Sequence, residues 1–218
     1  SKGDFSVIKG IAKSRKTFLI TMLLAAALRK KDMYAKFRNE LRGENVLYFD
    51  TEQSRIYVKK VLRRIDYLAD NELYTNNFIS CSLRAISPSL RLKVIEYAIY
   101  NIPNIGYVVI DGIRDLIMDI NSQEEATNIS TKLLKWTCEK NIHITTVLHE
   151  NKDGVYARGS IGSELVNKAE TVLKIVKKKE LSVISSEIVR GMPFEDIYFS
   201  INYDGIPELT KPSESEYF

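Results

Sequence analysis

The sequence contains little cysteine, histidine, proline or glycine, and each shortage excludes a class of protein. Its two cysteines, Cys81 and Cys138, form no CxxC pair, and with only two histidines the chain lacks the ligand spacing of a structural zinc site. Free thiols are typical of the reducing cytosol, so we expect a cytoplasmic protein. With 5 prolines and 10 glycines in 218 residues, the chain is neither collagen-like nor of low complexity.

The sequence also lacks a membrane-spanning run. The apolar residues 18–28 follow a basic segment and imitate a signal peptide, but a bilayer requires about 20 apolar residues. A strand-like segment with Asp4 precedes them, so we expect no membrane association. The chain begins with Ser1 rather than methionine, as expected of a trimmed chain or a domain cut from a longer protein.

The net charge of +4 is small, but the cations are concentrated in two stretches. Residues 29–42 contain six basic and two acidic residues, and residues 55–64 contain five basic residues and no acid. Such patches attract partners that carry phosphate groups. They are equally typical of solvated helix faces, and the sequence leaves both interpretations open.

Short apolar runs alternate with helical patterns along most of the chain. The runs are rich in β-branched and aromatic residues, as in strands buried on both faces. They cover residues 5–8, 46–49, 78–81, 107–110 and 142–148. Between them, apolar residues recur at helical spacing over 58–69, 90–99 and 126–136, the last preceded by a predicted cap at Ser122. This order predicts βαβ units and an α/β fold with a mostly parallel sheet.

The last fifty residues follow a different pattern. Three predicted strands, over 171–176, 181–188 and 197–201, are joined by short connections, which predicts an antiparallel C-terminal extension of the sheet. Because no long linker interrupts the chain, we expect a single domain over residues 1–211. Residues 212–218 are predicted to form a flexible tail.

Eight residues directly after the first predicted strand resemble a phosphate-binding loop. They are Gly10, Ile11, Ala12, Lys13, Ser14, Arg15, Lys16 and Thr17. The pattern GxxxxGK[S/T], between a strand and a helix, is matched except at its second glycine, which is Arg15. Backbone N–H groups at the start of a helix bind anions; Lys16 would reach the terminal phosphates and Thr17 would offer its hydroxyl to Mg²⁺.

Arg15 is the departure from this pattern. A side chain there costs about 1–3 kcal/mol of backbone strain. Lys13 and Arg15 would offset that cost by placing two cations beside a polyphosphate. The alternative is a basic turn that binds no ligand.

Two further predicted strands end in carboxylates. Residues 107–111 read YVVID, which places Asp111 where it would hold Mg²⁺ or its water; a turn cap is the alternative. Residues 46–52 read VLYFDTE, and Glu52 would polarise an attacking water. Alternatively, Glu52 is a surface carboxylate at the start of the next helix, where the dipole favours acids.

The order of these features resembles the RecA-like ATPases, in particular the branch with hexameric plasmid-replication helicases and related mobile-element ATPases. The resemblance spans residues 3–209 and is carried by Lys16 and Thr17, the DTE of 50–52, Asp111, and His149 after ITTVL. It implies a RecA-like three-layer αβα fold that uses ATP and Mg²⁺. Glu52 would activate water and His149 would be a polar sensor, although a satisfied core histidine is the alternative for His149.

The resemblance also implies contacts to DNA and to a neighbouring subunit. Residues 150–169 correspond to mobile, glycine-rich loops that touch DNA, with Lys152, Arg158 and Lys168 as the cations; a plain surface loop is the alternative. Arg190, and less closely Lys177–Lys179, would reach a neighbour's γ-phosphate, unless Arg190 is purely structural. A homo-oligomeric ring or filament on single-stranded DNA is therefore expected.

The sequence thus predicts an ATP-binding and ATP-hydrolysing domain of a DNA-replication or mobile-element motor or helicase. One alternative is a nucleotide-gated or degenerate scaffold with little or no ATP turnover. Another is a DNA-binding scaffold that binds no nucleotide and uses the two basic stretches. ATP binding without phosphate release is expected of the first alternative, and DNA binding independent of Lys16 of the second.

Overall fold

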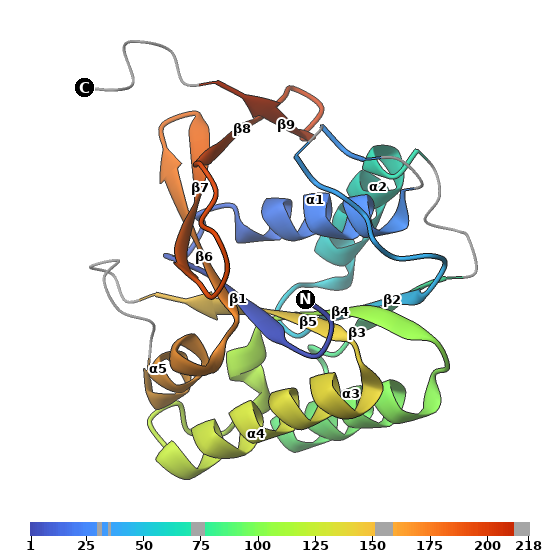
Figure 1. Cartoon of the computed structure of the whole chain (residues 1–218), viewed down its shortest axis with the longest axis vertical. Coiled ribbons are helices and arrows are strands. Elements are labelled where there is room, and N and C mark those ends of the chain that lie inside the picture. The colour runs from blue at the N-terminus through green and yellow to red at the C-terminus, as the bar shows by residue number, and fades with distance from the viewer. Residues whose placement is uncertain (30–31, 35, 71–76, 151–158, 212–218) are drawn as a thin grey trace.

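The computed structural model describes residues 1–29, 32–34, 36–70, 77–150 and 159–211 (Figure 1). Its elements in chain order are β1 (Phe5–Gly10), α1 (Lys16–Leu28), β2 (Asn45–Asp50), α2 (Arg55–Leu68), β3 (Phe78–Ser82), α3 (Pro88–Asn101), β4 (Ile105–Asp111), the 3₁₀ helix η1 (Ile113–Leu116), α4 (Gln123–Lys140), β5 (His143–His149), α5 (Gly159–Lys168), β6 (Thr171–Lys178), β7 (Leu181–Val189), β8 (Ile197–Ile201) and β9 (Pro207–Thr210).

The described strands form one nine-stranded sheet in the order β3-β2-β4-β5-β1-β6-β7-β8-β9. All neighbouring pairs from β3 to β6 are parallel, because each connection before β6 crosses over through a helix. The pairs from β6 to β9 are antiparallel and joined by short turns. The predicted α/β class, with a mostly parallel sheet and an antiparallel C-terminal extension, is confirmed, and the arrangement is consistent with a RecA-like fold.

Helices cover both faces of the sheet and give three layers (Figure 1). Helices α1 and α2 lie on one face, and α3, α4 and α5 lie on the other. One buried apolar cluster fills each interface, so the central strands are buried on both sides; all six residues of β1 are buried. The apolar stretch that imitates a signal peptide is α1, which packs between the sheet, α2 and β9.

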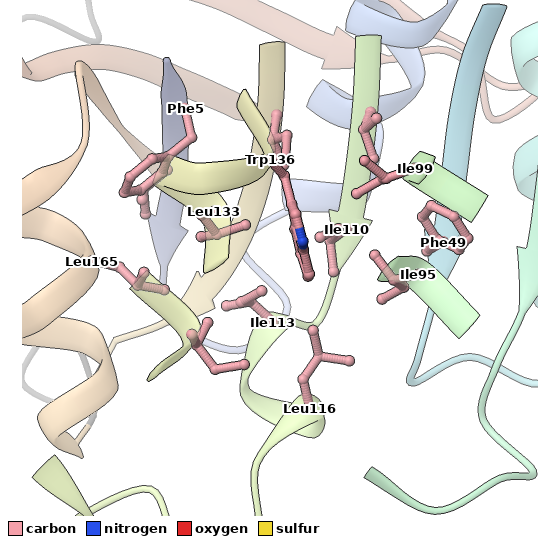
Figure 2. Packing of buried hydrophobic residues seen from close by; sticks show 14 of the residues in the cluster. Phe5, Phe49, Ile95, Ile99, Ile110, Ile113, Leu116, Leu133, Trp136 and Leu165 are labelled. Carbon is pink, nitrogen blue, oxygen red and sulfur yellow. The ribbon is translucent and has the colours of Figure 1, made fainter. Parts of the chain in front are cut away.

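The core beneath α3 and α4 centres on Trp136, which is 1% exposed (Figure 2). Its indole lies among Leu133 of α4, Ile99 of α3 and Ile110 of β4, and its Nε1–H donates to Glu96 at 3.2 Å. Ile110 immediately precedes the carboxyl end of β4. A close-packed core tolerates little displacement, so this cluster fixes the point at which β4 ends.

The sequence patterns missed three elements, η1, α5 and β9. The expectation of a loop throughout residues 150–169 is wrong for Gly159–Lys168, which form α5 because Ile161 and Leu165, four residues apart, are buried against the core below α4. Residues 151–158 and the predicted tail 212–218 lie outside the described residues. None of the helices in the described part of the chain is both long and apolar enough to cross a bilayer.

Candidate functional site

The register of the sheet brings the predicted site residues to one edge. Asp50 of β2 pairs with Asp111 of β4, and Gly10 of β1 pairs with His149 of β5. Because these strands are parallel, their carboxyl ends meet at the same edge, where ligands of open α/β sheets bind. A cavity of about 500 Å³ opens there. Its lining residues are Lys13, Ser14, Arg15, Lys16, Thr17, Phe18, Glu52, Gln53, Tyr57, Lys60, Val61, Arg64, Asp111 and His149.

The loop between β1 and α1 is built tightly around Gly10 and Ser14. A Cβ at Gly10 would lie 2.5 Å from the carbonyl oxygen of Ile175 and 2.7 Å from Ser14 Oγ, so only glycine fits there. Ser14 Oγ is itself buried and has no hydrogen-bond partner among the described residues. A buried hydroxyl without a partner, beside the N-terminus of α1, fits a loop that binds an anionic oxygen.

The ammonium group of Lys16 lies within this loop. Its Nζ donates to the carbonyl oxygens of Gly10 and Ile11, each at 2.8 Å. Burial lowers the pKa of Lys16 to about 8, against the opposing influence of Glu52 and nearby acids. The cation is therefore held within the loop, on two of the loop's own backbone carbonyls, and it lines the cavity.

Arg15 adopts the conformation that the missing glycine would supply. It is the N-cap of α1 with φ 71° and ψ 24°, in the left-handed region. Its Nη1 donates to the carbonyl oxygen of Glu180 at 2.6 Å and to Ser182 Oγ at 3.3 Å, both in the β6–β7 hairpin. The replacement therefore preserves the left-handed backbone, and contacts that glycine cannot make offset its strain.

Two carboxylates and a hydroxyl converge beside Lys16. Thr17 Oγ1 lies 3.4 Å from Asp111 Oδ2, and the buried Tyr48 hydroxyl donates to Asp50 Oδ2 at 2.9 Å and lies 3.4 Å from Asp111 Oδ2. Burial, together with Asp50 and Glu52, raises the pKa of Asp111 to about 7. Mg²⁺ in nucleotide sites is bound by one or two protein oxygens together with phosphates and water, so Thr17 and Asp111 fit this ion.

Glu52 and His149 contact each other at the mouth of the cavity. His149 Nε2 lies 3.1 Å from Glu52 Oε1, and this hydrogen bond is the main reason that the pKa of Glu52 is lowered. Asp50 Oδ1 accepts the backbone N–H groups of Glu52 and Gln53, which fixes the turn after β2. Glu52 is therefore an ionised carboxylate on a rigid turn, facing the cavity that Lys16 also lines.

The sequence reasoning missed two groups of residues at this site. Glu150 is buried below the loop, with Oε1 3.4 Å from Lys9 Nζ and 3.6 Å from Lys174 Nζ. Tyr57, Lys60 and Arg64 of α2 line the cavity. Helical periodicity indicates that these three residues lie off the buried face of α2. Only the packing of α2 on the sheet places them beside the phosphate loop.

Several predicted site residues lie away from the cavity. Gly10, Ile11 and Ala12 shape the loop but do not line the cavity. Arg190 follows Val189, which pairs with Thr171 at the start of β6. Arg190 therefore lies near the amino-terminal ends of the parallel strands, at the opposite end of the sheet from the cavity. It contacts the Lys168 carbonyl oxygen at 3.4 Å and Asp4 at 4.0 Å.

Arg190 therefore has no contact with the loop of its own chain among the described residues, and its role toward a neighbour stays a prediction. Lys168, in the last turn of α5, pairs with Glu164 at 2.6 Å. Its contact with DNA also stays a prediction. Lys152 and Arg158 lie outside the described residues.

A strand–loop–helix with a central lysine, whose helix begins beside the buried aspartate that ends β4, defines the class of P-loop ATPase domains. A family model described as an AAA domain matches residues 1–155, which include the loop, Glu52, Asp111 and His149. The chain belongs to this AAA domain family and is a nucleotide-binding P-loop ATPase domain. No curated protein matches the chain.

Proposed function

We propose that this domain hydrolyses Mg²⁺-ATP to drive an oligomeric motor on DNA, in replication or in a mobile element. The observation that carries the proposal is the convergence of an ionised Glu52, held by His149, with Lys16, Thr17 and Asp111 on one cavity. A binding site alone does not require a carboxylate kept ionised and aimed at the cavity. Hydrolysis uses such a group, because water has to be oriented for attack.

The triphosphate and its Mg²⁺ each have matching groups in this chain. The backbone N–H groups at the start of α1 and the Lys16 ammonium would hold the terminal phosphates. Thr17 and Asp111 would ligate Mg²⁺, which, when bound, neutralises charge on the phosphate oxygens. Ser14 Oγ, which is buried without a hydrogen-bond partner among the described residues, supplies one further donor in the loop.

Glu52 acts on water rather than on the phosphate. Because its pKa is lowered, it is ionised at neutral pH and accepts a hydrogen bond from a water placed for in-line attack. Asp50 fixes the position of Glu52 through the backbone N–H group, and His149 fixes its carboxylate. Lys16 stabilises the charge that develops on the transferred group.

The oligomeric and DNA-directed parts of the proposal rest on the resemblance to RecA-like ATPases. In such an assembly Arg190, at the opposite end of the sheet, would serve the nucleotide of an adjacent subunit. DNA would contact the segment that includes Lys152, Arg158 and Lys168. Coupling between subunits would then follow from an active site completed by a neighbour.

A nucleotide-gated scaffold is the second candidate function. Two observations favour it: Lys16 is hydrogen-bonded to carbonyls of its own loop, and Arg15 ties that loop to the β6–β7 hairpin. Both contacts stabilise the loop without a nucleotide. In this alternative, nucleotide binding would reorganise the hairpin without turnover.

Phosphate release from ATP with Mg²⁺ distinguishes the two functions. The wild-type protein and the variants Lys16→Ala and Glu52→Gln are compared with and without single-stranded DNA, and the oligomeric state is measured under the same conditions. We expect release by the wild type, stimulated by DNA, none by Lys16→Ala, and release slower by roughly 10²–10⁴ by Glu52→Gln. ATP binding without release by the DNA-bound oligomer would contradict hydrolysis and support the scaffold.

A further inference from the structure

The outward face of α2 carries only cations and large apolar side chains. Its seven exposed residues are Arg55, Ile56, Tyr57, Lys59, Lys60, Arg63 and Tyr67. The whole helix contains five cations and one acid, a net charge of +4 that equals the net charge of the 218-residue chain. This concentration of positive charge favours a polyanionic partner.

The burial pattern of α2 explains why this face is uniform. Val58, Val61, Ile65 and Leu68 recur at helical spacing and are buried against the sheet and α1, so the cations are left outside. Arg64 is the exception, because it stacks on Phe18 and donates to the carbonyl oxygen of Gly205. Asp66, the one acid of the helix, is half-buried and does not reach the outward face.

The four outward cations, Arg55, Lys59, Lys60 and Arg63, form no ion pair with any described residue. Elsewhere on the protein, cations such as Lys132 of α4 and Lys168 of α5 are paired with glutamates. Four cations on one helix without an ion pair in the described part of the chain can bind phosphate groups, and each contact releases condensed counterions.

Aromatic rings lie between these cations. Tyr57 is 59% exposed and Tyr67 is 66% exposed, and Ile56 between the cations is 69% exposed. Lys60 Nζ lies 5.2 Å from the centre of the Tyr57 ring, so charge and aromatic surface occur together. Exposed aromatic rings stack with unpaired bases, which only a single strand offers freely.

The helices on the opposite face of the sheet provide the contrast (Figure 1). The exposed residues of α3 include a single cation, Lys93, and those of α4 include Lys135 together with Glu124 and Glu139. These faces carry few charges, or charges of both signs, as ordinary solvated helices do. The face of α2 is therefore not simply typical of the helices of this protein.

We propose that the exposed face of α2 binds single-stranded nucleic acid, with the four cations on the phosphates and Tyr57 and Tyr67 stacked on bases. The proposal does not depend on ATP binding or ATP hydrolysis. This surface contains none of the cations that the resemblance to RecA-like ATPases assigns to DNA. Because Tyr57 and Lys60 also line the cavity beside the phosphate loop, a strand bound here would lie next to bound nucleotide.

Fluorescence anisotropy with labelled oligothymidylate and oligouridylate, and with a DNA duplex of equal length, tests the proposal. The double variant Lys59→Glu/Arg63→Glu changes two residues that do not line the cavity. We expect about a tenfold or greater loss of affinity for single strands, and a salt slope smaller by about 1.4 from the two lost phosphate contacts. The matched control is Lys93→Glu/Lys135→Glu, which makes the same charge change on the opposite face and is expected to bind as the wild type does.

Tyr67→Ala separates stacking from charge. We expect roughly a tenfold loss of affinity with an unchanged salt slope, since stacking releases no counterions. Thermal unfolding and nucleotide binding of each variant verify that the fold and the cavity are intact.

Three outcomes would overturn the proposal. One is equal single-strand binding by Lys59→Glu/Arg63→Glu and its matched control, which would leave the proposed ATPase function standing. Another is tighter binding of duplex than of single strands by the wild type. The third is a change of oligomeric state in the α2 variants at unchanged affinity for single strands, which would make this face a subunit contact. If the wild type released no phosphate from ATP, that result would contradict the proposed ATPase function and leave the proposal for α2 standing.

Discussion

The guanidinium of Arg15 donates a hydrogen bond to the carbonyl oxygen of Glu180 across 2.6 Å, between residues 165 positions apart in the chain. The residue that replaces the second glycine of the phosphate loop is thus anchored to the β6–β7 hairpin. That hairpin belongs to the antiparallel extension, beyond the residues that match the AAA domain. The shape of the loop therefore depends on a part of the chain that the loop motif does not include.

Substitutions at Arg15 separate its contacts from its backbone strain. Arg15→Ala loses the hydrogen bonds and keeps the left-handed backbone, so we expect the free energy of unfolding to fall by about 2 kcal/mol. Arg15→Gly also loses the contacts but relieves a strain of about 1–2 kcal/mol, so it is expected to be less destabilising. Urea unfolding measures both. Equal losses in the two variants would show that position 15 is unstrained.

Replacing Glu52 is expected to separate nucleotide binding from turnover. Glu52→Gln keeps the shape of the side chain but removes the ionised acceptor, so kcat for ATP hydrolysis should fall by roughly 10²–10⁴ while ATP affinity is retained. His149→Ala, which leaves Glu52 in place but removes its 3.1 Å contact, should reduce kcat by a smaller factor. Steady-state phosphate release and equilibrium nucleotide binding check both. A larger effect at His149 would make the histidine, not Glu52, the main catalytic group.

Replacing Asp111 is expected to stabilise the fold and to weaken the binding of Mg²⁺-ATP. Asp111 is 6% exposed and lies near two other carboxylates, so its ionised form is unfavourable in the protein without nucleotide. Asp111→Asn should therefore raise the free energy of unfolding and weaken binding of Mg²⁺-ATP, with little effect on binding of ATP without the metal. Denaturant unfolding and titrations with and without Mg²⁺ measure these effects. If Asp111→Asn is less stable than the wild type, the carboxylate has a structural role.

The titration of His143 should destabilise the domain in mild acid. Its ring stacks on Tyr107, and its Nε2 lies 2.8 Å from Ser6 Oγ. Burial lowers the pKa of His143 below 6.5, so the unfolded chain takes up its proton first as the pH falls. The contribution of His143 to the free energy of unfolding should be constant above that pH and decrease below it. Asp111 acts in the opposite direction, because its pKa is raised to about 7 and the folded state takes up this proton first.

His143→Gln removes this titration and leaves that of Asp111, so the variant should lose less stability, or gain more, than the wild type as the pH falls. Urea midpoints of both proteins at about pH 7.5 and about pH 5.5 provide the comparison, since carboxylates of ordinary pKa stay ionised over that range and Asp111 titrates in both proteins. Equal slopes for the two proteins would assign the acid sensitivity to other groups.

Much of the fold follows from local patterns. The β-branched runs and the helical stripes between them predicted the parallel strands in the right places, since buried strands and amphipathic helices have distinct periods. The resemblance to RecA-like ATPases predicts a glycine-rich loop over Gly159–Lys168, whereas burial of Ile161 and Leu165 stabilises α5. The four-residue β9 begins with Pro207, which gives no strand signal; it forms by pairing with β8.

The sequence predicts those site residues that follow a single strand or belong to a single loop. Lys16, Thr17, Glu52, Asp111 and His149 all line the cavity, because residues at the carboxyl ends of parallel strands share an edge. Contacts between distant segments have no such local signal. The bond from Arg15 to Glu180, the burial of Glu150 between two lysines and the position of Tyr57 all depend on how separate elements pack.

Calorimetric titration with a non-hydrolysable ATP analogue and Mg²⁺ tests the central claim most directly, namely that the loop from Gly10 to Thr17 binds a triphosphate with arginine in place of its second glycine. We predict saturable binding of one analogue per chain to the wild type and loss of that binding in Lys16→Ala, with both proteins equally folded. Absence of binding to the wild type at millimolar analogue, or equal binding to Lys16→Ala, would contradict it.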